Sequence, residues 1–366
     1  MDHAPSWRAP WHPRGTRGAP TRKRGSRGSR GSTDSAVRHA WGALPAFLTL
    51  TVAGSLSAQQ PAFGPLTTEE GAPLYRITFV PTMERAEVVE RGALSVDVWL
   101  GLSNIFEQDS SETHDLFVDM ERLLTAVTVR WGVADDLELG GRLTFETAGG
   151  GFLDSFVVRY HELLGFGQAN RDRFPSNAHE ERLGDGDRLL IEDDGPRTLG
   201  LDDARIFLKW RAAASGDGRS VLSFKTVGWL PAQSNRVGER KANLALIGLA
   251  RVGVGSWYLH GLLGAATTRA APELDAIVRR ASTFLSIGVE RSLGSSLAGV
   301  VQYQIAPPLL HGFGHRELDG VASNIVFGLA GRWGESWSWD VGFQEDLPAD
   351  TPAIDFTLGV RVSRSW

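Results

Sequence analysis

The sequence predicts an all-β fold, a closed antiparallel β-barrel of about twelve strands with one amphipathic helix in a long loop. Three observations predict it. Segments in which apolar and polar residues alternate recur from residue 92 onward in the 366-residue chain. Short turns and long loops alternate between these segments. The last segment ends on an aromatic residue.

The alternating segments define the expected strands. Successive side chains of a strand point to opposite faces, so alternation produces one apolar face and one polar face. Residues 74–80 could add one further short strand. The twelve segments lie near 92–104, 114–132, 137–148, 202–213, 219–230, 242–254, 256–267, 280–291, 296–306, 321–333, 337–346 and 354–366.

The connections between these segments alternate in length. An outer-membrane barrel has short turns at its periplasmic end and longer loops at its extracellular end, whereas a soluble sandwich requires no such order. We therefore expect a transmembrane antiparallel β-barrel in the bacterial outer membrane. Short turns fall at 135–136, 215–218, 253–255, 294–296 and 334–336, and longer links near 105–113, 149–201, 231–241, 268–279, 307–320 and 347–353.

Tryptophans lie near the ends of the expected strands. Aromatic rings of this kind form girdles at the headgroup level of a membrane barrel, although burial in a soluble core is the alternative. We expect Trp131, Trp210, Trp257, Trp333, Trp337 and Trp366 near the short-turn end, and Trp99 and Trp229 near the long-loop end.

The C-terminal strand has a strict two-residue period. Phe356, Leu358, Val360 and Val362 share one face, polar residues share the other, and Trp366 ends the strand. This pattern resembles the C-terminal signal that outer-membrane proteins present to the barrel-assembly machinery, and Arg364 is the one position that departs from it. The alternative is an ordinary amphipathic strand of a soluble sandwich.

The N-terminus is expected to be a targeting segment. Residues 1–39 are basic, residues 40–58 form an apolar stretch that ends in small residues, and cleavage is expected near Ala58. A membrane anchor is the alternative, and translation could start at Met1 or at Val37. We therefore expect an extension and signal peptide over 1–58, a periplasmic leader over 59–90, and the barrel over 91–366.

Composition restricts the function further. The chain has no cysteine, which excludes a disulfide framework. Residues 1–58 hold nine of the 38 Lys and Arg residues and two of the 43 Asp and Glu residues, so a chain cleaved after Ala58 has a formal net charge of −12. A nucleic-acid partner is therefore not expected. The absence of a later apolar run of 18 residues argues against a helical membrane protein.

The strand pattern is interrupted over 149–201. Apolar residues recur there at helical spacing, which predicts an amphipathic helix over 151–164 that plugs the lumen or caps the extracellular mouth. The longest and most acidic loop follows it. Candidate lumen or gating residues in this region are Phe152, Phe156, Arg159, Tyr160, His161, Glu162, Arg171, Arg173, Asp202 and Asp203.

Several short motifs in this region are specific. They are G-G-G-F-L-D at 149–154, Y-H-E-L-L-G at 160–165, R-D-R-F-P at 171–175 and L-D-D-A-R-I-F-L-K-W at 201–210. They resemble a family of Gram-negative outer-membrane proteins known as domain of unknown function 3187, from about residue 63 to the C-terminus. The resemblance implies a barrel fold and an outer-membrane location, and no activity.

Motifs for catalysis and metal binding are incomplete. His161-Glu162 lacks the second histidine of a zinc-protease helix, since Gly165 occupies that position. His311 with His315, Asp193-Asp194 and Asp202-Asp203 are weak metal candidates. The serine next to a histidine that an outer-membrane phospholipase needs is missing. We therefore expect no catalytic residue, metal or cofactor, and a membrane-embedded lipid enzyme is the least favoured alternative.

The expected function is passage or binding of a small solute, and the main alternative is a structural or surface-interaction protein. Expected partners are outer-membrane lipid and lipopolysaccharide, the barrel-assembly machinery and a small-molecule solute. Polar residues expected to face the lumen are Arg130, Glu138, Arg142, Lys209, Arg211, Lys225, Arg251, Glu290 and Gln302.

Overall fold

The computed structural model describes residues 62–73, 75, 79–110, 114–164, 171–185, 188–193, 195–231, 242–269, 272, 274–313, 318–346 and 356–366. The predictions on the signal peptide, on cleavage near Ala58 and on a start at Met1 or Val37 lie outside the described residues. The chain divides into two units, Met1–Ala53 and Gly54–Trp366, and the second unit contains every element below.

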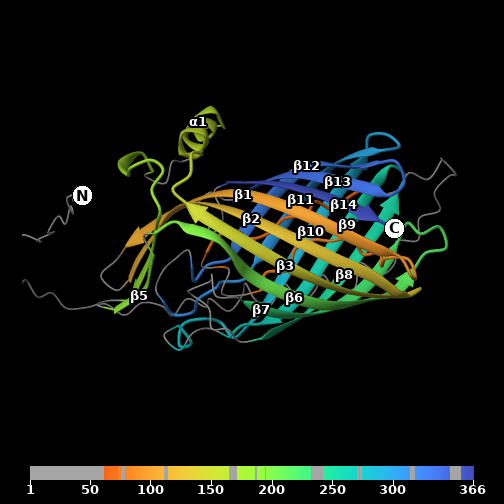
Figure 1. Cartoon of the computed structure of the whole chain (residues 1–366), viewed down its shortest axis with the longest axis horizontal. Coiled ribbons are helices and arrows are strands. Elements are labelled where there is room, and N and C mark those ends of the chain that lie inside the picture. Colours follow the sequence, from red (N-terminus) through yellow and green to blue (C-terminus); the bar gives the residue numbers. More distant parts are fainter. Residues whose placement is uncertain are drawn as a thin grey trace, which may run out of the picture. The chain divides into compact units, whose positions relative to one another are not determined.

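Twelve strands of the described chain close into an antiparallel barrel (Figure 1). Strand β1 pairs with β14 on one side and with β2 on the other, so the sheet has no free edge along the wall. The predicted fold class is confirmed. The strands are β1 (Leu94–Ser110), β2 (His114–Ala134), β3 (Leu137–Gly149), β6 (Arg197–Ala214), β7 (Val221–Pro231), β8 (Asn243–Val254), β9 (Trp257–Thr267), β10 (Ala281–Ser292), β11 (Leu297–Ala306), β12 (Ala322–Trp333), β13 (Trp337–Asp346) and β14 (Phe356–Ser365).

Two further strands lie in the long loop, where no strand was predicted. Strands β4 (Glu180–Asp185) and β5 (Arg188–Asp193) form a hairpin. Strand β4 pairs with His114–Asp119 of β2, beyond the part of β2 that pairs with β3. The sheet therefore continues past the barrel rim. The predicted strand over 74–80 is not seen at residues 75, 79 and 80, and the rest of that range lies outside the described residues.

The barrel is apolar outside and polar inside. Along β10, Leu285, Ile287 and Val289 are about half exposed, whereas the residues between them are buried. Exposed leucine, isoleucine and valine side chains occur in the same way on the other barrel strands. This distribution is the reverse of that in a soluble domain, which buries its large apolar side chains.

The tryptophans at the short-turn end follow the predicted pattern, and all six are exposed on the outer face. The predicted girdle role is wrong for Trp99 and Trp229, because both side chains face inward and are 2% and 3% exposed, although Trp229 does lie near the long-loop end of β7. Trp99 has the same phase on β1 as the inward residue Asp97. Its indole Nε1–H donates to the carbonyl oxygen of Thr67 at 3.0 Å.

The segment before β1 lies inside the barrel. We call residues 62–90 the lumen segment; it is described at 62–73, 75 and 79–90. Its hydrogen bonds and ion pairs reach inward side chains from ten of the twelve barrel strands, which is only achieved from within the lumen. These side chains are Trp99, Arg122, Glu138, Arg142, Arg205, Lys209, Ser223, Lys225, Arg251, Glu290, Gln302, Asn324 and Asp340.

This placement corrects the predicted periplasmic leader. The lumen segment has no alternating pattern because it does not pair with neighbouring strands; it is held instead by side chains of the wall. The helix α1 (Asp154–Leu164) and the short 3-10 helix η4 (Arg171–Arg173) follow β3. Neither of the described helices is long and apolar enough to cross a membrane.

Candidate functional site

The lumen segment enters and leaves the barrel at the same end. The backbone N–H groups of Phe63 and Gly64 donate to the carboxylate of Glu290 at 2.7 and 3.0 Å, close to the short turn that follows β10. At the other end of the segment, Val89 N–H donates to Glu138 at 2.9 Å, next to the short turn between β2 and β3. The lumen segment is therefore a loop inserted from the short-turn end.

The rising part of this loop is held by charged side chains of the wall. Glu69 accepts two hydrogen bonds from the guanidinium of Arg205, at 3.0 and 3.3 Å, and pairs with Arg142 at 2.8 Å. Arg122 donates to the carbonyl oxygen of Gly71 at 2.8 Å. Asn324 donates to Glu70 at 3.1 Å, near the long-loop end of β12.

The descending part is held in the same way from other strands. Lys225 pairs with Glu84 at 2.7 Å, and Arg251 pairs with Glu87. Arg85 crosses between the two parts and donates to the carbonyl oxygen of Phe63 at 2.8 Å. Because a buried charge left without a partner is costly, these pairs fix the position of the segment within the lumen.

Apolar contacts complete the filling of the lumen. The rings of Phe79 and Trp229 lie 6.2 Å apart, and Met83 is buried against Gly288 of β10. Trp99 lies flat over Gly101, and its Nε1 is 3.1 Å from the Cβ position of Gly359. The two glycines therefore leave the space that the inward indole occupies.

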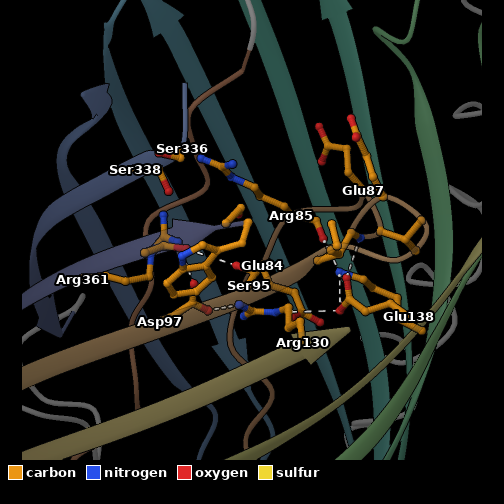
Figure 2. Close-up of a pocket in the computed structure, with 18 of the residues that line it drawn as sticks. Glu84, Arg85, Glu87, Ser95, Asp97, Arg130, Glu138, Ser336, Ser338 and Arg361 are labelled. Atoms are coloured by element: carbon orange, nitrogen blue, oxygen red, sulfur yellow. Dashed lines mark hydrogen bonds and ion pairs between the residues drawn. The ribbon is translucent and has the colours of Figure 1, made fainter. Parts of the chain in front are cut away.

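A cavity of about 500 Å³ lies at the short-turn end, between the lumen segment and the wall (Figure 2). It extends from Arg85 of the segment to rim residues such as Trp366. The ion pairs of Asp97 with Arg130, and of Lys209 with Glu138 at 3.2 Å, border it. Hydroxyl groups of the wall supply much of the remaining lining, at Ser95, Ser336, Ser338, Ser363 and Ser365.

A second cavity of about 50 Å³ lies farther inside, lined by Phe79, Arg142, Arg205 and Lys225 among others. A space of that size holds one or two water molecules. The large cavity, by contrast, lies at the short-turn rim, and residues within 84–90 of the lumen segment form part of its lining.

The structure places most of the predicted gating residues away from the lumen. Phe152 is exposed just before α1, Phe156, Arg159 and Glu162 are exposed on it, and Arg173 is exposed beyond it. Tyr160 is half-buried, and its ring contacts Phe343 on the outer face of β13. His161 lies 3.4 Å from Glu345, and Arg171 lies 2.8 Å from Asp154.

The helix therefore lies outside the barrel (Figure 1), and its rings contact outward residues of the last two strands. The alternative that it plugs the lumen is wrong, because the lumen segment occupies that position. The amphipathic pattern identified a helix with a face to bury, but it could not identify which surface of the barrel that face would meet.

Asp202 and Asp203 are the predicted candidates that do border the lumen. A register irregularity in the β3–β6 pairing lies between Leu201 and Asp203. Both carboxylates are buried: Asp203 pairs with Arg205 at 2.7 Å, and Asp202 lies 3.8 Å from Arg122. Guanidinium groups of the wall thus contact the two carboxylates, where a metal ion had been a weak prediction. Among the described residues, no group of three or more acidic or histidine side chains is arranged to hold a metal ion.

The predicted inward polar residues are buried or half-buried on the lumen side, with one exception. Arg211 instead pairs with Asp136 at 2.6 Å in the exposed turn between β2 and β3. The lumen segment itself was missed. Complementary charge is the sequence feature that could have identified it. Arg142, Lys209 and Lys225 face inward, and the preceding segment carries acidic residues at 69, 70, 84 and 87.

The predicted assembly-signal residues lie on the outer face of β14. Leu358 and Trp366 are exposed, Val360 and Val362 are half-buried, and Phe356 is covered by α1. Leu94 and Trp366 exchange backbone hydrogen bonds of 3.2 and 2.9 Å, which joins the last residue to β1. The guanidinium of Arg364 stacks on the rings of Trp366 and Trp337, which explains how a cation is accommodated there.

Comparison with solved structures gives barrels of the same general kind. The COG4313 outer membrane channel from Pseudomonas putida F1 is 12% identical with a TM-score of 0.47, over 77% of this chain and 98% of that chain. The translocator domain of autotransporter NalP from Neisseria meningitidis is 10% identical with a TM-score of 0.37, over 76% and 89%. The KdgM porin is 10% identical with a TM-score of 0.36, over 74% and 99%.

The comparison with curated proteins gave no match. A family model described as Protein of unknown function (DUF3187) matches residues 45–363, which is most of the chain. The resemblance noted from the motifs at 149–210 is thereby confirmed, and the chain belongs to this family.

Proposed function

We propose that the protein is an outer-membrane barrel that passes a small polar solute, and that the lumen segment closes the pathway at rest. A wall with an apolar outer face, whose strands pair around a closed ring, is suited to a bilayer, where no water can satisfy a free sheet edge. Its short turns correspond to the periplasmic end of such barrels and its long loops to the extracellular end.

The observation that carries the proposal is the path of the lumen segment. Because it enters and leaves at the short-turn end, it can withdraw toward the periplasm without being unthreaded. Ion pairs such as Lys225–Glu84 and Arg142–Glu69 hold it. Such pairs contribute little net stability when both partners can regain water, so their release is less costly than their number suggests.

The polar cavity at the short-turn rim supports passage of a solute rather than a purely structural role. Its lining presents both charge signs and several hydroxyl groups, so it suits a small polar or zwitterionic molecule. A barrel with a solely structural role has no need for a second chain segment inside it, since wall side chains alone can fill a narrow lumen.

A disulfide that locks the lumen segment to the wall tests the proposal. The Cβ position of Gly342 on β13 lies 3.7 Å from Cβ of Leu66, within the roughly 3.5–4.5 Å range of a disulfide. The chain has no other cysteine, so Leu66→Cys/Gly342→Cys forms a single defined bridge. Conductance in planar bilayers is measured with the bridge oxidised and then reduced.

The matched control is Ala250→Cys/Gly261→Cys. The Cβ position of Gly261 lies 4.0 Å from Cβ of Ala250, and this bridge joins β8 to β9 without touching the lumen segment. We expect reduction to restore channel opening only in the first variant. If Leu66→Cys/Gly342→Cys has equal conductance in the oxidised and reduced states, and mass spectrometry verifies the bridge, the lumen segment has no gating role. No conductance in any variant would favour the structural or surface-interaction alternative.

A further inference from the structure

The helix α1 is attached to outward-facing residues of the barrel. Its start is held by Glu121 of β2, which accepts the N–H of Phe152 at 2.5 Å, and by Asn104 of β1, which donates to Asp154 at 2.8 Å. Both side chains point outward, since the neighbouring residues Ser103 and Arg122 on the same strands point into the lumen. The helix therefore begins on the outer face, at the long-loop end.

The rest of α1 continues over the last two strands. The ring of Phe156 meets Phe356 of β14 edge to face at 5.5 Å, and Tyr160 meets Phe343 of β13 at 5.5 Å. His161 lies 3.4 Å from Glu345, also on β13. The order of contacts is β2, β1, β14 and β13, so α1 runs around the circumference and crosses the seam where the first and last strands meet.

This position coincides with one edge of the apolar outer band. Phe356 and Trp366 are ten positions apart on the last strand. At ~3.3 Å per residue and a strand tilt of roughly 40°, that separation spans about 25 Å along the barrel axis, which is the height of the apolar band of such barrels. Phe343 also packs on Phe327, an exposed residue of the band, at 4.9 Å. The helix thus borders the lipid-facing surface directly.

Part of the exposed side of α1 is apolar, next to the rings that contact the barrel. Phe156 and Leu163 are 50% and 82% exposed, and Phe152, just before the helix, is 71% exposed. At about 100° per residue, Phe156 and Leu163 fall within roughly 20° of each other around the helix axis and form an apolar stripe. Arg159 is exposed in the same stripe, whereas Asp154, Val157 and His161 are buried on the opposite side. An amphipathic helix in water would normally turn its apolar stripe toward the protein.

We propose that α1 is an interfacial helix that inserts Phe156 and Leu163, together with Phe152 just before it, among the acyl chains of the outer leaflet. Arg159 extends from this stripe to the phosphate groups of the same lipids, as long cationic side chains do at membrane interfaces. Lipid is the occupant because ring contacts connect Phe156 through Phe356 and Phe343 to Phe327, which is exposed on the apolar outer band. This proposal rests on the proposed outer-membrane location and is independent of solute passage.

Fluorescence quenching in lipid vesicles tests the contact. The full chain without native cysteine carries one labelled cysteine at a time and is reconstituted in phosphatidylcholine with bromine on the acyl chains near the headgroup. Leu163→Cys reports the helix stripe, and Glu162→Cys reports the adjacent exposed position about 100° around the helix. Ile287→Cys on the outer face of β10 is the lipid-exposed control, and Asp217→Cys in a short turn is the aqueous control.

We expect bromine to quench the label at Leu163→Cys at least about threefold more than the label at Glu162→Cys, as for a helix lying in the interface. If bromine quenches the label at Ile287→Cys but leaves the label at Leu163→Cys as insensitive as that at Asp217→Cys, the inference is overturned and the barrel remains in the membrane. If bromine quenches the label at neither Ile287→Cys nor Leu163→Cys, the membrane location itself is overturned. Disulfide-linked dimers of Leu163→Cys, with no quenching, would instead assign the stripe to a second copy of the chain. Heat-modifiable migration on gels confirms that each variant is folded.

Discussion

The carboxylate of Glu69 and the guanidinium of Arg205 form a two-point contact inside the barrel, with N–O distances of 3.0 and 3.3 Å. Glu69 is 1% exposed and belongs to the lumen segment, whereas Arg205 belongs to the wall strand β6. Arg205 contacts both oxygens of the carboxylate, and Arg142 of β3 also pairs with Oε1 at 2.8 Å. One residue of the segment thus pairs with two cations of the wall.

Replacing Glu69 with glutamine should loosen the lumen segment. Glu69→Gln removes the carboxylate that pairs with Arg142 and one of the two carboxylates that pair with Arg205, and breaking a buried pair in this way costs about 3–5 kcal/mol. We expect a lower midpoint of urea unfolding and a higher open probability in planar bilayers. The exposed helix residue Glu162, which lies outside the lumen, supplies the control Glu162→Gln, which should change neither. Unfolding and conductance like those of the control would show that Glu69 does not hold the segment.

The inward indole of Trp99 gives a second prediction. Gly101→Ala places a methyl group where the ring of Trp99 lies, so the ring must move away from its hydrogen bond to Thr67. Overpacking of this kind costs about 1–3 kcal/mol. Gly261→Ala is the matched control on the outer face, where the nearest side-chain atom is 4.0 Å away. Urea unfolding should separate the two variants, and equal midpoints would contradict the tight contact seen here.

The strands were predictable because their signal is local. In each of the twelve barrel strands, one face meets an apolar surface and the other a polar interior, which imposes a two-residue period on the sequence. The same two-residue period predicts that the side chains of Trp99 and Trp229 point inward. On β1, Trp99 is in phase with the buried residue Asp97, and the paired residues Arg361 and Asp340 show that this side of the wall faces the lumen. Nearness to a strand end, by contrast, does not indicate to which face a side chain points.

The contents of the lumen were not predictable from periodicity. The lumen segment makes no ladder, so no repeat marks it, and its partners are spread over strands from residue 99 to residue 340. The position of α1 was hidden for a related reason. Helical spacing shows that Phe156 and Tyr160 share a side, but their partners Phe343 and Phe356 lie almost 200 residues later in the chain.

The contact between α1 and β13 should depend on pH. Burial, followed by the nearby carboxylate of Glu345, raises the pKa of Tyr160 to about 12 from its ordinary value of 10.0. A group whose pKa is raised on folding contributes stability that is complete below its unfolded pKa and is lost as the pH rises through the folded value. The helix should therefore stay docked up to about pH 10 and be released between about pH 10 and pH 12.

The ultraviolet titration of tyrosinate measures this directly. The chain has four tyrosines, and Tyr160→Phe should remove one that ionises near pH 12 in the folded protein. The label at Leu163→Cys should report helix release over the same pH range. If Tyr160→Phe instead removes a titration step at pH 10, the phenol is not held in the environment described.

The last residue of the chain should matter more for assembly than for the finished barrel. Trp366 is exposed on the outer face at the short-turn end, where a charged residue costs a folded barrel only about 0–1 kcal/mol. Trp210 occupies a comparable exposed position on β6, at the same end, but inside the chain. If β14 carries the signal for the assembly machinery, Trp366→Asp should lower the amount of folded protein in the outer membrane several-fold. Trp210→Asp should leave that amount close to normal.

Refolding of both variants from urea into detergent micelles separates assembly from stability. There the assembly machinery is absent, so the two variants should fold to similar yields and show similar unfolding midpoints. Equal loss of both variants from the outer membrane would mean that a charge at the girdle is harmful in itself. Normal membrane levels of Trp366→Asp would mean that the terminal aromatic residue is not part of the signal, and that the hydrogen bonds between Leu94 and Trp366 are sufficient to close the barrel.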